Sequence, residues 1–402
     1  MTLAIQYLED CSIIAGLTPN EAQARLRAAF DLLPISLVLL GWDTPEALIA
    51  ACAQEADRAG AQLFRWHPLL TGDGLLTPRS EWQCIGLNGE RVTGHQGKAE
   101  FSFICPNRPE VREAVLDHLR DMLRRGTWQG VFLDRIRYPS PAADPTNALA
   151  SFCDDCHRAA ANIGFDLEAA RRSIIKLVTM PQHVELFIRA LLDPLAHTPP
   201  DADLDALKAL LDFRAGSVTR LVESAAGLAH AAGLAVGLDC FSPALTRLVG
   251  QDLGALKAHC EWIKIMSYAH ALGPAGLPFE LLGLADWLMD RQGIRESTAL
   301  EWLSRATHLP LPRSRIELRE QGLAPQTLAA EVKRGRAVGI GTLLAGIELV
   351  EMEGVTRLNP MQIRNDLRAL RDAHADGLAI SWDLWRIPLE RLELVRQVWQ
   401  AM

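Results

Sequence analysis

The sequence predicts an α/β protein in which eight parallel strands close into a (β/α)8 TIM barrel, with helical insertions after strands 3, 4 and 6. Two observations support this fold class. Eight short apolar runs, most of them ending in polar or aromatic residues, alternate along the chain with stretches of helical pattern. The runs are almost unbroken in apolar residues, as expected of strands that helices cover on both faces. Eight strands of this kind favour a closed barrel over an open, doubly wound sheet.

The predicted strands are rich in leucine or β-branched residues. In chain order they are LAIQY (3–7), SLVLLGW (36–42), AQLFRWH (61–67), GVFLD (130–134), AVGLD (235–239), WIKIMSY (262–268), TLLAGIE (342–348) and GLAISWD (377–383). The segment EFSFIC (100–105) could also be a strand, with LAIQY as a lead-in. Either choice leaves GVFLD as the fourth strand.

Several of the intervening helices have readable starts. Thr18 provides a capping hydroxyl, Pro19 follows at the first helical position, and Glu21 lies three residues after the cap. This order is typical of a helix N-terminus. The segments that start at Thr44 and Asn107 predict helix starts of the same kind.

The long connections indicate one elaborated domain. They cover 68–129, 139–234 and 269–341, and no Ser/Gly-rich linker separates them from the strands. We therefore expect a single barrel domain over 1–402, with a helical insertion at 143–205 inside it.

Composition and charge narrow the class of protein. The 402 residues are 49% hydrophobic and 22% charged, which is ordinary for a globular protein with a large core. A net charge of −8 argues against a nucleic-acid partner. The N-terminus lacks the basic start of a signal peptide, the most apolar stretch is too short to span a membrane, and the eight cysteines are scattered. We expect a cytoplasmic protein with reduced thiols, no membrane partner and no sequence signal of its oligomeric state.

Polar and aromatic residues gather where the predicted strands end. In a barrel, the carboxyl ends of the strands and the loops after them form the site. A rim of acids and flat rings suits a sugar, whose C–H faces pack on aromatic rings and whose hydroxyls bind carboxylates. The candidate substrate-binding residues are Tyr7, Trp42, Arg65, His67, Arg137, Tyr138, Lys264, Tyr268, Trp382 and Asp383.

The segment GVFLDRIRYPSP (130–141) carries an acid out of the core at Asp134. It resembles the strand-4 signature of glycoside-hydrolase-like (β/α)8 barrel families, which read roughly DGI-x-LD-x-IRYP. The upstream PNRPEVRE (106–113) and the downstream FCDDC (152–156) are similar to segments of sugar-active barrels. The chain departs from the commonest form at Val131 and Gln129. The resemblance implies sugar chemistry, with Asp134 as the catalytic carboxylate.

Three acids are therefore candidates for catalysis. We expect Asp134 to be the nucleophile or electrostatic stabiliser, and Glu348 or Asp239 to be the proton donor. Burial among apolar strand residues could keep such a donor protonated. Glu348 is favoured on the expectation that strands 4 and 7 face each other across the barrel. A carboxylate separation of about 5 Å would predict retention, and about 7–9 Å inversion.

Each of these residues also has a structural interpretation. Asp134 could be an acid held by Arg135 or Arg137, Glu348 could belong to a buried ion pair, and Asp239 could hydrogen-bond a neighbouring loop. Two of the binding candidates have similar alternatives. Lys264 could bind substrate or hold an acid of strand 7, and Asp383 could contact a sugar or cap the next helix.

The pair Cys153 and Cys156 permits three interpretations. A Cys-x-x-Cys-His sequence matches a haem attachment site, which belongs to exported proteins. A zinc site would need further ligands, and Cys84, Cys105 or His157 could supply them only through the fold. The third interpretation is a helical turn with its thiols directed inward. We assign no cofactor and no metal, and we expect any zinc that binds to be structural.

The expected function is glycosidase chemistry on an oligosaccharide or glycoside, with paired carboxylates at the C-terminal mouth of the barrel. The sequence lacks a His-x-His in the first strand, a Gly-rich phosphate loop after strand 7, a nucleotide fingerprint and a nucleophile elbow. Two alternatives stay open. One is a non-catalytic carbohydrate-binding or regulatory barrel, and the other is a sugar-directed lyase or isomerase with Lys264 or Tyr268 as base.

Overall fold

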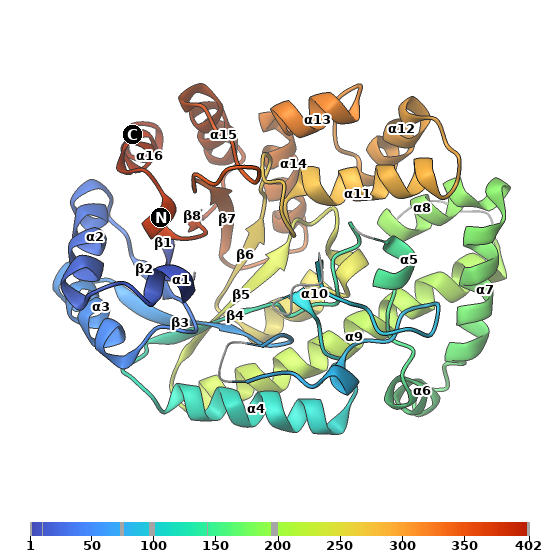
Figure 1. Cartoon of the computed structure of the whole chain (residues 1–402), viewed down its shortest axis with the longest axis horizontal. Helices are drawn as coiled ribbons and strands as arrows, with labels where there is room; N and C mark the ends of the chain where they lie inside the picture. Colours follow the sequence, from blue (N-terminus) through green and yellow to red (C-terminus); the bar gives the residue numbers. More distant parts are fainter. Residues whose placement is uncertain are drawn as a thin grey trace.

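The computed structural model describes residues 2–9, 11–72, 76–95, 101–142, 144–193 and 200–399. Its strands are all parallel and close into one barrel in chain order (Figure 1). They are β1 (Thr2–Tyr7), β2 (Leu37–Leu40), β3 (Gln62–Pro68), β4 (Gly130–Asp134), β5 (Ala235–Phe241), β6 (Trp262–Met266), β7 (Leu343–Glu348) and β8 (Gly377–Ser381). The predicted fold class and all eight predicted strands are confirmed.

Helices surround the barrel and fill the long connections (Figure 1). They are α1 (Cys11–Ile14), α2 (Pro19–Leu32), α3 (Glu46–Ala59), α4 (Pro109–Leu123), α5 (Pro145–Ala148), α6 (Asp154–Ala161), α7 (Leu167–Thr179), α8 (Val184–Leu192), α9 (Ala202–Ala231), α10 (Leu253–Leu256), α11 (Leu277–Asp290), α12 (Glu296–Thr307), α13 (Arg315–Gln321), α14 (Pro325–Ala337), α15 (Pro360–Asp372) and α16 (Leu389–Trp399).

The predicted helix starts are right in position and partly wrong in their caps. Thr18 and Glu21 form a reciprocal capping box at the start of α2, as predicted. Thr44 does not cap α3, because its hydroxyl donates to the carbonyl of Gly41 instead. Asn107 does not cap α4, where Arg108 holds the N-cap position without a side-chain hydrogen bond.

Alternate residues of the strands face the helices or the barrel interior. Outward residues such as Val131 and Leu133 join the core shared with the helices. Inside, a separate cluster of rings fills the barrel, and Phe132 stacks on Trp262 at 5.1 Å between centroids. Gly237 makes room for the indole, because a Cβ there would lie 2.1 Å from the Trp262 ring.

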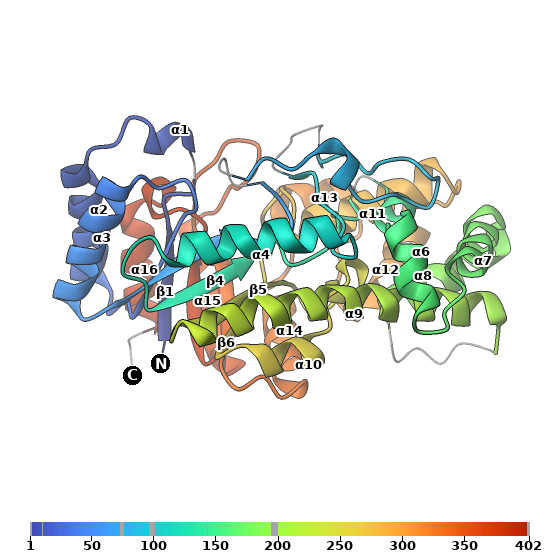
Figure 2. The ribbon, with the colours of Figure 1, turned by 90° about the horizontal axis from the view of Figure 1, so that it is seen from below.

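The insertion after β4 builds a lobe beside the barrel. Figure 2 shows α9 running below the barrel toward α6, α7 and α8 at its far end. Helix α7 packs on α9, and α8 packs on α12 from the insertion after β6. These contacts join the two insertions, and the organisation as one domain over 1–402, with a helical insertion at 143–205, stays a prediction.

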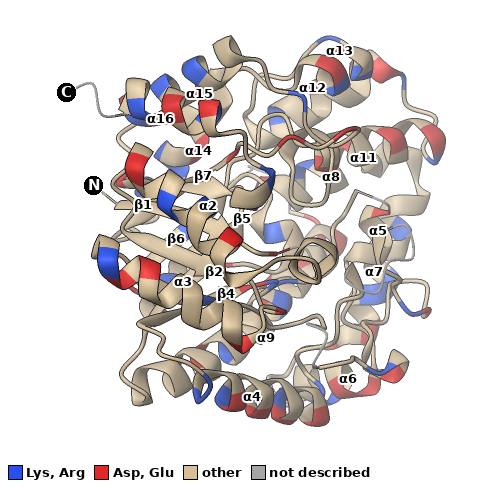
Figure 3. Cartoon of the chain, turned by 60° about the vertical axis from the view of Figure 1, so that its left-hand side comes forward, with Lys and Arg blue, Asp and Glu red and all other residues tan. Residues whose placement is uncertain are grey.

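Charges of both signs occur on the outer helices. In Figure 3, basic and acidic residues alternate along α3 and α4, in keeping with an ordinary solvated surface. Within the part of the chain that the structure describes, no helix is both long enough and apolar enough to cross a membrane.

Candidate active site

Asp134 is the last residue of β4 and alternates with outward-facing Leu133, so it faces the barrel interior at the C-terminal end. The indole Nε1 of Trp66 donates to its Oδ2 at 2.9 Å, and the backbone amide of Arg135 donates to its Oδ1. Arg135 has a φ of +53°, in the left-handed region that is uncommon for a side chain of this size. Strained backbone of this kind concentrates at functional sites. Asp134 is 9% exposed and held in a fixed orientation.

The two arginines after Asp134 serve other contacts. Arg135 lies over the ring of Trp42 at 4.9 Å and donates to the hydroxyl of Thr71. Arg137 lies between the rings of Phe103 and Phe241, at 4.3 and 4.6 Å. The hydrogen bonds that orient Asp134 therefore come from an indole and a backbone amide, although Arg137 is close enough to interact with it electrostatically.

Asp239 and Lys264 form a buried pair on the neighbouring strands β5 and β6. The ammonium Nζ lies 3.0 Å from Oδ2 of Asp239 and also donates to Oε1 of Gln6 at 2.9 Å. Both side chains are buried, and Tyr268 lies beside them with its ring 5.3 Å from Nζ. The second oxygen of Asp239, Oδ1, has no hydrogen-bond partner among the described residues. Burial raises the pKa of Asp239 to about 7, although the ammonium of Lys264 opposes this shift.

The strand register places Asp134 and Asp239 side by side. Leu133 of β4 pairs with Leu238 of β5, so the two acids that follow occupy neighbouring positions at the strand ends. Neighbouring strands lie about 4.8 Å apart. The two carboxyl groups interact electrostatically, since the charge of Asp134 further raises the pKa of Asp239. The structure thus brings two of the three candidate acids together.

Glu348, at the end of β7, belongs to a different network. Its Oε1 accepts a hydrogen bond from the backbone amide of His270 at 2.6 Å, and the imidazole of His270 contacts Asp366 at 2.8 Å. Burial raises the pKa of Glu348 to about 7. The closed strand order places β8 across from β4, so the expectation that strands 4 and 7 face each other is wrong by one strand.

Four predicted rim residues point toward the helix layer. The hydroxyl of Tyr7 donates to the carbonyl of Ala22 in α2, and the hydroxyl of Tyr138 pairs with Ser151. Arg65 and His67 alternate along β3 with inward-facing residues. The Arg65 guanidinium donates to the carbonyl of Trp42 and lies over the Trp128 ring, and the ring of His67 lies 5.3 Å from that of His118 in α4. The structure does not bring these four side chains together with Asp134.

Three further binding candidates, Trp42, Trp382 and Asp383, occupy different positions. Trp42 lies in the interior cluster, and Trp382 lies 5.8 Å from the ring of Tyr268. Asp383 accepts hydrogen bonds from the backbone amides of Leu8 and Trp385, so its carboxylate fixes the chain after β1 and β8. These hydrogen bonds favour the interpretation of Asp383 as a helix cap over its interpretation as a sugar contact.

A pocket of about 250 Å³ opens among the loops after β3, β4 and β6. Arg137 links it to the acids, because its guanidinium lines the pocket and interacts electrostatically with Asp134 and Asp239. None of the three acids lines the pocket itself. Its walls are Asn88, Glu90, Arg91, Val92, Thr93, His95, Phe101, Phe103, Arg137, Pro139, Ser140, Asp144, Asn147, Ala148 and Pro274.

Sequence reasoning missed most of this wall. Among the predicted site residues, Arg137 alone lines the pocket, and it follows a recognisable strand. Pro139 and Ser140 belong to the GVFLDRIRYPSP segment, and Phe101 and Phe103 belong to EFSFIC (100–105), which the sequence offers only as a possible strand. The other residues come from long connections that carry no recognisable motif.

The chain shares its fold with solved structures of glycoside hydrolases. The glycoside hydrolase domain of PgaB (BpsB) from Bordetella bronchiseptica aligns over 99% of this chain and 98% of its own, with a TM-score of 0.54 and 13% sequence identity. Alpha-L-fucosidase isoenzyme 2 from Paenibacillus thiaminolyticus aligns over 99% of this chain and 48% of its own, with a TM-score of 0.53 and 10% identity. No family model and no curated protein matches the chain. Similarity at these identities shows a shared fold, whereas activity depends on the side chains of the site.

Proposed function

We propose that the chain hydrolyses a glycosidic bond of an oligosaccharide or glycoside with Asp134 and Asp239 as the catalytic pair. One observation carries the proposal, namely two carboxyl groups at adjacent strand ends in unlike environments. Asp134 is held by an indole and an amide, and Asp239 is buried against an ammonium. Pairs of acids whose surroundings differ in this way divide the roles of acid and nucleophile.

In the proposed reaction, Asp239 is the proton donor. It gives its proton to the glycosidic oxygen while the carboxylate of Asp134 attacks the anomeric carbon, and the bond to the leaving group breaks. Water then attacks the anomeric carbon of the glycosyl ester, the bond from that carbon to Asp134 breaks and frees the carboxylate, and the carboxylate of Asp239 takes a proton from that water. A separation close to the strand spacing of about 4.8 Å suits this retaining route better than the wider gap that an inverting enzyme needs.

Lys264 supports Asp239 after the carboxyl group has given up its proton. Its ammonium lies 3.0 Å from Oδ2 and stabilises the carboxylate that forms when Asp239 has lost its proton. The unpartnered Oδ1 is then the oxygen that carries the proton toward substrate. We place the sugar in the pocket beside Arg137, where Phe101 offers a half-buried ring and Asn88 and Asn147 offer hydrogen bonds.

Of the alternatives, the carbohydrate-binding barrel has one observation in its favour. Asp239 is only 2% exposed, and no candidate acid lines the pocket, so the pocket could hold a sugar away from the carboxylates. The lyase or isomerase alternative has less support. As a base, Lys264 would have to be neutral or Tyr268 ionised. The nearby charge of Asp239 raises the pKa of Lys264 above its usual value against the effect of burial, and burial raises the pKa of Tyr268.

A pH profile tests the assignment of the donor. Asp239 must hold its proton to act, and its pKa is raised to about 7. We therefore expect kcat/KM to fall about tenfold for each pH unit above that value, because the protonated fraction falls in proportion. The measurement is kcat/KM against pH on whichever member of a panel of aryl glycosides and oligosaccharides the full chain cleaves. Binding of a panel sugar without turnover at any pH would instead support the binding barrel.

A further inference from the structure

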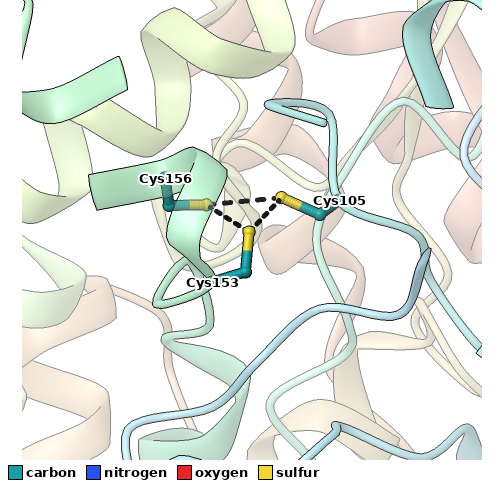
Figure 4. A group of neighbouring side chains, drawn as sticks. All are labelled: Cys105, Cys153 and Cys156. Carbon is teal, nitrogen blue, oxygen red and sulfur yellow. Dashed lines mark hydrogen bonds between the residues drawn. The ribbon is translucent and has the colours of Figure 1, made fainter. Parts of the chain in front are cut away.

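Three cysteine sulfur atoms meet in the interior beside the pocket (Figure 4). Cys105 comes from the connection after β3, while Cys153 and Cys156 come from the N-cap and first turn of α6. The Sγ atoms are 3.6 Å apart for Cys105 and Cys153, 3.3 Å for Cys105 and Cys156, and 3.4 Å for Cys153 and Cys156. All three side chains are buried.

These separations fit a metal site better than a disulfide. A disulfide joins two sulfur atoms at about 2.05 Å, and all three cysteines are free. Four thiolates around a tetrahedral zinc ion at about 2.3 Å stand about 3.8 Å from one another. The triangle would need to widen by only a few tenths of an ångström to become one face of that tetrahedron.

Cys84 is the candidate for the fourth sulfur, although it lies outside the group of three cysteines whose sulfur atoms are all within 4.8 Å of one another. It is fully buried, and its thiol interacts with the thiol of Cys105. The backbone holds the two residues on paired segments, because Cys84 donates to the carbonyl of Phe103 and Cys105 donates to the carbonyl of Trp82. The cluster thus gathers the ligands that zinc prefers, from two hairpin segments and one helix N-terminus.

The surroundings suit a negatively charged site. Arg214 is 0% exposed, and its hydrogen bonds go to the backbone carbonyls of Ala148, Ala150 and Leu248, all neutral groups. A buried guanidinium with only neutral partners is costly. Arg214 interacts electrostatically with Cys84 and Cys156. A zinc ion with four thiolates carries a net charge of about −2, which would more than offset the single positive charge of Arg214.

Polar groups also point at the sulfur atoms. The amide of Asn107 donates to Sγ of Cys156 at 3.4 Å, and the hydroxyl of Ser151 donates to the same sulfur at 3.3 Å. Second contacts of this kind orient metal ligands and favour their deprotonated form.

We propose that Cys84, Cys105, Cys153 and Cys156 bind one zinc ion that ties the connection after β3 to the insertion after β4. Four thiolates leave no open position for substrate or water, so the ion is structural. It sets one wall of the pocket, because Asn88 and Asn147 lie on the two segments that it joins. The proposal does not depend on the proposed hydrolysis, and it supplies the ligands that sequence alone could not connect to Cys153 and Cys156.

The test is metal analysis of the full chain, purified under reducing conditions without chelator from zinc-supplemented cells. We expect about one zinc per chain by inductively coupled plasma mass spectrometry. Cys84→Ser and Cys153→Ser should each lose most of that zinc and melt at a lower temperature. Cys52→Ser changes a cysteine that is equally buried, in α3, and should keep the metal.

Replacement of zinc by Co²⁺ in the wild-type chain keeps the test independent of whether the variants fold. Four thiolates should give intense sulfur-to-cobalt charge-transfer bands and the visible bands of a tetrahedral site. The proposal is overturned if the reduced wild-type chain neither contains zinc nor takes up Co²⁺ with these bands. It is equally overturned if Cys84→Ser keeps full zinc and an unchanged cobalt spectrum, or if peptide mapping finds a Cys153–Cys156 disulfide in freshly prepared protein.

Discussion

Asp134→Asn should abolish turnover while the chain keeps its fold and its affinity for sugar. The amide has the shape of the carboxylate, and its oxygen can still accept a hydrogen bond from the indole of Trp66 or the amide of Arg135. It cannot attack the anomeric carbon or stabilise a positive charge that develops there. We expect kcat to fall by several powers of ten, each worth about 1.4 kcal/mol of barrier, with sugar binding almost unchanged.

Melting temperature, sugar affinity and turnover of Asp134→Asn should be measured on one preparation. If Asp134 only balanced Arg135 or Arg137, the variant would lose about 3 kcal/mol of stability and stay active per folded molecule. The contacts argue against that outcome, because Arg135 lies over the ring of Trp42 and Arg137 lies between two rings. A destabilised but fully active variant would remove Asp134 from the mechanism.

Asp239→Asn should lose activity to an extent that depends on the leaving group. Without the donor, a glycoside that needs its oxygen protonated should be cleaved about 10²- to 10⁴-fold more slowly. A glycoside with a strongly acidic leaving group, such as a dinitrophenyl glycoside, needs no proton and should lose far less in its first step. Because Lys264 loses its partner in this variant, a lower melting temperature is also expected.

Glu348→Gln is the matched control for Asp239→Asn. Both acids end a strand, both are buried, and burial raises the pKa of each to about 7. Glu348, however, hydrogen-bonds the backbone of His270, whereas Asp239 lies beside Asp134. We expect Glu348→Gln to cleave both kinds of substrate at close to the wild-type rate. The same leaving-group dependence in Glu348→Gln, with none in Asp239→Asn, would transfer the donor role to Glu348.

The barrel could be predicted because each strand is a compact apolar run. Eight such runs separated by helical patterns leave few topologies. The caps were harder to predict. Thr44 has the composition of an N-cap, but its hydroxyl binds the carbonyl of Gly41, a preference that only the folded loop sets.

Side-chain direction explains why part of the predicted rim does not reach the site. Arg65 and His67 alternate along β3 with Phe64 and Trp66, whose rings lie in the barrel interior. A barrel strand is covered on both faces, so apolar residues occur on both of them. No hydrophobic alternation therefore reveals which residues face inward. The adjacency of Asp134 and Asp239 follows from the pairing of β4 with β5, which the predicted strand order implies, and from their register, which the structure provides.

Trapping the glycosyl-enzyme tests the central claim most directly. The wild-type chain would be incubated with the 2-deoxy-2-fluoro analogue of the glycoside that it cleaves, and the labelled peptide would be mapped by mass spectrometry. The account predicts one sugar per chain, bound as an ester to Asp134, and no label on Asp134→Asn. A label on Glu348 or Asp239, or hydrolysis that proceeds with inversion at the anomeric carbon, would contradict it.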